Sequence, residues 1–233
     1  DRFLVNSLGL STVRTGVVLA AMALGSFLSG ASARHLAARM GATGVVVLGL
    51  SLEVIGVGLL AWVVGAQGST WLTVLTLVVY GIGLGLASAQ LTSTVLHDIP
   101  ADQSGAGSAT QSTVRQLGSA LGAAIAGSAL GSAMNHTIPD AVTSASRVPA
   151  RALDTLVRAT QSSAGSVIPG LRNAPPTSPF IRPLGESRDA VIGGLETGFA
   201  HAAAWSIGLS SLFLIIGLLG AIMVRHQARK QVS

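Results

Sequence analysis

The chain of 233 residues is 49% hydrophobic and only 10% charged, whereas soluble domains are about 25% charged. Its net charge of +5 comes from basic residues scattered through turns and the C-terminal end, without a basic patch between aromatic residues, so no nucleic-acid partner is expected. The chain has no cysteine, which excludes disulfides, thiolate metal sites and cysteine nucleophiles. We therefore expect an all-α membrane protein whose 29 glycines serve close helix packing.

Five apolar stretches are long enough to cross about 30 Å of hydrocarbon as helices. A short amphipathic or loop segment, residues 1–15, precedes them, and no proline interrupts any of the five. Within residues 1–133 the predicted transmembrane helices are 16–33, 44–65, 71–96 and 104–133, and the fifth is 202–224.

The fourth stretch contains a single charged residue, Arg115. Gln111, Gly118 and Gly122 share a helix face with it, because residues three and four apart stack on one side of a helix. The glycines favour close approach by a neighbouring helix. An arginine facing lipid is costly, so Arg115 is expected to face protein or water.

The segment between the last two spans, residues 134–201, holds seven of the eight prolines and is predicted to lie outside the membrane. Within it, 149–161 has the pattern of a short amphipathic helix that begins at a proline. A second short helix is expected over 189–200, leading into the last span, and 174–187 is expected to be loop.

The short basic segments set the predicted orientation. The turn between the first two spans carries Arg34 and Arg39, and the tail 225–233 is also basic. Positively charged short segments stay in the cytoplasm, so residues 134–201 fall on the outside of a cell membrane.

Several motifs follow one another along the chain: Gly81-Ile-Gly83-Leu-Gly85, a turn at Pro100, Thr113-Val-Arg115-Gln116-Leu-Gly118-Ser-Ala-Leu-Gly122, and Gly198-Phe199. This order resembles the C-terminal half of a major facilitator superfamily transporter. More narrowly, it is similar to the fourteen-span drug:proton antiporter family of multidrug exporters.

The resemblance implies that the five spans form most of a C-terminal six-helix bundle, and that the chain is a fragment completed by an N-terminal half. It also implies export of small amphipathic or cationic compounds in exchange for protons, through alternating access. The lipid bilayer, the substrate and protons are then the partners. A small polytopic membrane subunit or scaffold with no transport activity of its own is the alternative.

A cavity-lining role for the third span follows from the resemblance, although its polar side chains fit helix–helix hydrogen bonding equally well. Arg115 suits substrate contact, pairing with an acid, or donation to helix-end carbonyls. The cavity candidates are Tyr80, Ser88, Gln90, Thr92, Gln111 and Arg115. The helix-packing candidates are Gly81, Gly83, Gly85, Gly118 and Gly122.

Glu53 is predicted to lie near mid-bilayer in the second span, where a buried acid can carry a proton or pair with Arg115. The resemblance argues against the first role, because it makes that span a peripheral helix.

The turn after the first span resembles the cytoplasmic gating loop G-x-x-x-D-R-x-G-R through Gly30, Arg34, Arg39 and Gly41. Ala38 stands where the acid belongs and no base follows Gly41, so Arg34 and Arg39 are favoured as positive-inside anchors.

No phosphate loop, metal cluster or nucleophile–base pair occurs in the sequence, and the five histidines are dispersed. We therefore expect neither enzyme activity nor a metal or other cofactor.

Overall fold

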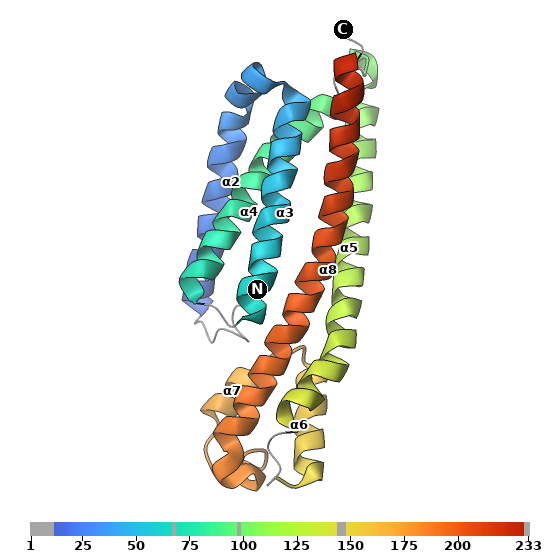
Figure 1. The fold of residues 1–233 in the computed structure, drawn as a ribbon. Helices are drawn as coiled ribbons and strands as arrows, with labels where there is room; N and C mark the ends of the chain where they lie inside the picture. The colour runs from blue at the N-terminus through green and yellow to red at the C-terminus, as the bar shows by residue number, and fades with distance from the viewer. Residues whose placement is uncertain (1–11, 67–68, 97–98, 144–147, 231–233) are drawn as a thin grey trace. The chain divides into compact units, whose positions relative to one another are not determined.

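A computed structural model describes residues 12–66, 69–96, 99–143 and 148–230 (Figure 1). These residues are almost wholly helical and include no strand, which confirms the predicted all-α fold. The segment expected before the first span lies outside the described residues up to residue 11. The elements in order are α2 (Thr12–Met40), α3 (Ala42–Gly65), α4 (Thr70–Leu96), η1 (Ala101–Gln103), α5 (Ser104–Val142), α6 (Ala150–Ser162), α7 (Ile168–Asn173), η2 (Arg182–Ser187) and α8 (Arg188–Lys230).

Four helical segments in the described part of the chain are long and apolar enough to cross a membrane: 42–65, 71–93, 104–142 and 182–227. The first predicted span, 16–33, lies within α2, and its membrane crossing stays a prediction.

Two helices are much longer than a bilayer requires. α5 has 39 residues and α8 has 43. At 1.5 Å per residue they are roughly 58 and 65 Å long, about twice the thickness of the hydrocarbon layer. The predicted spans 104–133 and 202–224 are therefore only parts of these helices.

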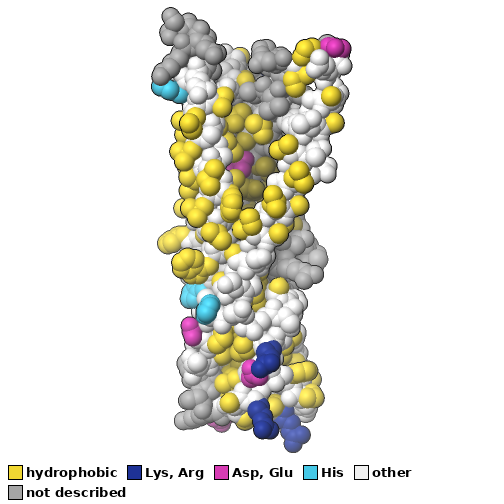
Figure 2. Space-filling model, turned by 90° about the vertical axis from the view of Figure 1, so that its right-hand side faces the viewer, with side chains coloured by type: hydrophobic (Ala, Val, Ile, Leu, Met, Phe, Trp, Pro, Cys, Tyr) yellow, Lys and Arg dark blue, Asp and Glu magenta, His cyan; other side chains and the backbone are white. Residues whose placement is uncertain are grey.

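The described chain forms two compact units, and both α5 and α8 contribute to each. Among the described residues, unit 1 comprises those within 12–17, 61–70 and 127–206, and unit 2 comprises those within 18–60, 71–126 and 207–230. On the face drawn in Figure 2, hydrophobic side chains cover much of the part formed by unit 2, and Lys and Arg side chains gather on the part formed by unit 1.

Unit 1 has a hydrophobic core of its own. The α6 face predicted to be apolar turns inward: Leu156 is buried, and Leu153 and Val157 are half-buried against the core. The buried members are Met134, Ile138 and Val142 of α5, Val148, Leu156, Ile168 and Leu171, Ile181 and Leu184, and Val191, Ile192, Leu195, Phe199 and Ala202 of α8. Burial of apolar side chains stabilises such a core, and the extramembrane location of 134–201 stays a prediction.

Glycines on α8 bring α5 into close contact with it inside unit 1. A Cβ at Gly198 would lie 2.8 Å from the Thr137 carbonyl oxygen, and Thr137 Oγ1 donates a hydrogen bond of 2.7 Å to the Gly198 carbonyl. The next residue, Phe199, packs its ring on Gly165, which has a φ of 79°. The Gly198-Phe199 motif therefore joins α8 to α5 and to the turn after α6.

α7 was not expected from the sequence, and arginines hold it in place. Arg188 Nη2 donates to the carbonyl oxygens of Leu171, Arg172 and Ala174, at 3.3, 2.8 and 2.9 Å. Arg172 Nη2 forms an ion pair of 2.9 Å with Glu196 Oε2 on α8. Together these contacts attach a six-residue helix that is too short to be stable alone.

Candidate functional site

The three alternating glycines of α4 serve two neighbouring helices in unit 2. A helix turns about 100° per residue, so Gly81 and Gly85 share a face and Gly83 lies on the opposite one. A Cβ at Gly81 would meet the Met22 carbonyl oxygen of α2. A Cβ at Gly83 would stand 2.6 Å from the Gly49 carbonyl oxygen of α3. α4 therefore packs closely against α2 on one side and α3 on the other.

α3 packs against α4 through two glycines of its own, which were not predicted from the sequence. A Cβ at Gly49 would lie 2.6 Å from the Ala87 nitrogen, and one at Gly56 would lie 2.8 Å from the Tyr80 nitrogen. The two glycines are seven residues apart, and this two-turn spacing places both on one helix face. That spacing is the signal that would have found them.

Glu53 lies between these two glycines and is buried, with 5% of its surface exposed. Its Cγ would be 3.0 Å from a Cβ placed at Gly83. The acid therefore sits in the α3–α4 seam.

The C-terminal end of α4 and the first turns of α5 carry five of the six predicted cavity residues. Gln111 Nε2 donates to Thr92 Oγ1 at 3.2 Å, which brings two of these residues together. Gln90 is buried and Ser88 is exposed. Tyr80 is half-buried with its backbone against Gly56, away from the Gln111–Thr92 contact along α4.

Arg115 is exposed on α5, one turn after Gln111. A Cβ at Gly118 or Gly122 on the same face would meet nothing within 4 Å. The described residues form two ion pairs, Arg158–Asp154 and Arg172–Glu196, and neither involves Arg115 or Glu53.

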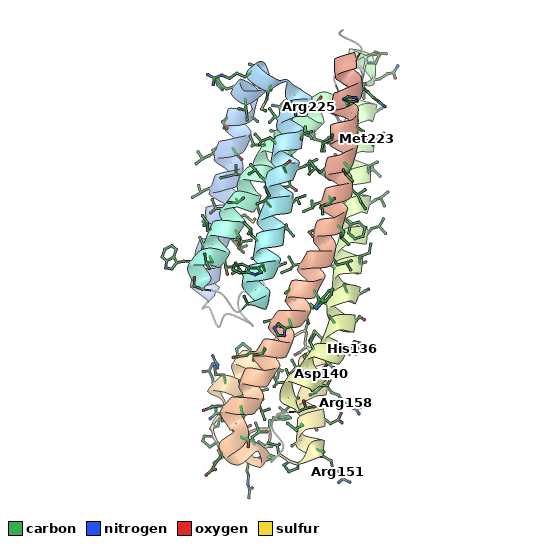
Figure 3. All side chains as sticks on the ribbon, in the orientation of Figure 1. His136, Asp140, Arg151, Arg158, Met223 and Arg225 are labelled. Carbon is green, nitrogen blue, oxygen red and sulfur yellow. The ribbon has the colours of Figure 1, made fainter. Side chains whose placement is uncertain are left out.

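The predicted gating turn joins α2 to α3. Gly41 takes a φ of 79°, which is costly for other residues, and Arg34 and Arg39 are exposed. Gly30 lies against Gly85 of α4. Arg225, at the C-terminal end of α8 (Figure 3), places its guanidinium carbon 3.7 Å from a Cβ position on Gly44.

A metal site has no support among the described side chains, since no three His, Asp or Glu residues are grouped to hold an ion. His136 and Asp140 are four residues apart on α5 and both exposed (Figure 3). They supply two ligands at most, whereas structural metal sites use four.

Long apolar helices that pack through glycines and expose hydrophobic side chains define the chain as a multi-pass helical membrane protein. The family model described as Major Facilitator Superfamily matches residues 2–123, more than half of the chain, so the chain belongs to this superfamily of transporters. Comparisons with the curated proteins and with the solved structures give no match. The resemblance predicted from the motifs is thus confirmed at the level of the superfamily.

Proposed function

We propose that the chain is the C-terminal part of a fourteen-span exporter that moves small amphipathic or cationic compounds out of the cell in exchange for protons. Membership of the superfamily supports transport of a small molecule. The Thr113-x-Arg115-Gln116-x-Gly118 order in α5 supports the drug:proton antiporter branch.

The observation that carries the proposal is the polar group on α4 and α5 next to the packed helices. Gln111 and Thr92 are hydrogen-bonded, and Arg115 follows on the same face of α5 as Gln111. Polar and charged side chains inside a membrane are costly and mark substrate pathways. We assign this group to one wall of the substrate cavity, with Ser88, Gln90 and Tyr80 as further candidates along α4.

The test is the accumulation of ethidium, a fluorescent organic cation, in cells that express the complete protein. We expect lower accumulation than in cells with an empty vector, and a protonophore should restore it. Reduced accumulation that a protonophore leaves unchanged would contradict proton coupling. Accumulation equal to that of the empty vector would favour the membrane subunit without transport activity of its own.

Arg115 gives the sharpest residue-level test of the proposed wall. We expect Arg115→Ala to abolish ethidium export while the protein remains in the membrane, as measured by immunoblotting of membrane fractions. Arg115→Lys is the matched control, because it keeps the charge but loses the planar fork of donors. Undiminished efflux in Arg115→Ala would remove this residue from the mechanism.

A further inference from the structure

The α3–α4 seam buries a carboxyl group that the proposed cavity does not use. Glu53 is the twelfth of the 24 residues of α3, so it lies at the middle of a helix that has no other Asp, Glu, Lys or Arg. Besides its contact with Gly83 through Cγ, its backbone nitrogen would be 2.7 Å from a Cβ at Gly83. The close approach of α3 to α4 at Glu53 therefore depends on the lack of a side chain at residue 83.

The charged groups on the surrounding helices lie away from Glu53. On α4, Tyr80 is the titratable side chain next to the seam, one turn from Gly83. On α2 the charged and titratable residues of known placement, Arg34, His35 and Arg39, stand near the turn to α3. Arg225 of α8 contacts Gly44, nine residues or about 13 Å along α3 from Glu53. Arg115 of α5 is exposed.

An ionised carboxylate buried without a cation is strongly unfavourable, and a membrane offers it no water. The closed seam therefore favours the neutral carboxylic acid. Separation of α3 from α4 would admit water and allow the proton to leave, so the protonation of Glu53 and the packing of the seam depend on each other.

We propose that Glu53 is a proton-binding residue of the transport cycle. It takes up one proton from water to become a carboxylic acid when α3 and α4 are packed as in this structure. It returns that proton to water as the carboxylate when the seam opens. This inference rests on the proposed proton-coupled export, and it gives α3 a direct part in coupling.

Proton binding can be measured without any transport, by infrared difference titration of the complete purified protein in lipid. We expect a C=O stretching band of a protonated carboxylic acid that changes with pH, is lost in Glu53→Gln and is shifted in Glu53→Asp. The matched control is Glu186→Gln, on the exposed η2 segment, which should keep the band. A band that persists in Glu53→Gln would overturn the inference.

Transport in proteoliposomes separates this inference from the proposed function. In Glu53→Gln we expect loss of ethidium movement driven by a pH gradient, with movement down an ethidium gradient retained, and Glu53→Asp should restore part of the loss. Glu53→Gln with unchanged pH-driven transport would remove Glu53 while leaving the exporter intact. The wild type could move no ethidium and still show the infrared band, with the band absent from Glu53→Gln. In that case the exporter assignment fails and the proton site remains.

Discussion

The turn after α6 shows how single backbone conformations determine the stability of unit 1. Ala164 has a φ of 48°, and Gly165 has one of 79°. The Ala164 N–H donates to the Gln161 carbonyl and the Gly165 N–H to the Thr160 carbonyl, at 3.2 and 2.9 Å. This is the hydrogen-bond pattern of a Schellman motif, in which glycine is usual at the place that Ala164 occupies.

Replacement of Ala164 by glycine should stabilise the protein by about 1 kcal/mol, because a left-handed conformation is strained for alanine but not for glycine. The measurement is thermal unfolding followed by circular dichroism in detergent. The matched variant is Gly165→Ala, which should destabilise, since its Cβ would come within 2.7 Å of the Phe199 ring. Equal effects of the two changes would contradict this account of the turn.

At the scale of the element, α3 provides two glycines two residues apart that differ in their surroundings. Gly56→Ala should destabilise the protein by about 1–3 kcal/mol, because overpacking a close helix contact displaces backbone. Its Cβ would lie within 2.9 Å of Tyr80 Cα, whereas a Cβ at Gly58 would meet nothing within 4 Å. Gly58→Ala should therefore leave the unfolding temperature unchanged or raise it. A loss as large as that of Gly56→Ala would disprove the seam.

The attachment of the short helix α7 also belongs to the scale of the element, and it depends on Arg188. Arg188→Ala should lower the free energy that holds α7 in place by about 2 kcal/mol, because it leaves three helix-end carbonyls without their charged donor. Arg188→Lys should recover only part of this, since one ammonium cannot reproduce the guanidinium fork. Limited proteolysis near residues 173–181 measures the release of α7. Cleavage of Arg188→Ala at the wild-type rate would show that the clamp is dispensable.

The sequence predicts most of the elements, and the contacts explain where it falls short. Hydrophobic length alone identified α3, α4 and the apolar parts of α5 and α8, and the amphipathic pattern identified α6. α7 escaped prediction because Ile168–Asn173 is a short helix with a proline in its first turn, and it depends on Arg188, which is fourteen or more residues away. Distant partners of this kind leave no periodic pattern in the sequence.

In the candidate site, too, motifs close together in the sequence were predictable, and contacts between residues far apart in the sequence were not. The glycines of α4 and the polar side chains around Arg115 were visible as motifs, and the contact of Gln111 with Thr92 needed the fold. The burial of Glu53 followed from its apolar neighbours. Its place opposite Gly83 depends on the alignment of α3 with α4, which one sequence does not contain.

At the scale of the whole molecule, the absence of cysteine from these 233 residues makes their orientation measurable by labelling introduced cysteines. Single cysteines at Thr177 and Ala38, both exposed, should react with a membrane-impermeant maleimide from opposite sides. We expect Thr177→Cys to be labelled in intact cells and Ala38→Cys only after permeabilisation. The reverse pattern would invert the proposed topology, and labelling of both in intact cells would contradict it.

The two-sided glycine motif of α4 limits how unit 2 can deform. Because the backbone of α4 is in close contact with α2 on one face and α3 on the other, we expect these three helices to move together unless one of the two contacts opens. The buried acid Glu53 of α3 lies at the contact with α4, whereas α2 contributes no acid to the opposite contact. Under the proposed role of Glu53, binding or release of one proton would therefore act on the α3–α4 contact alone.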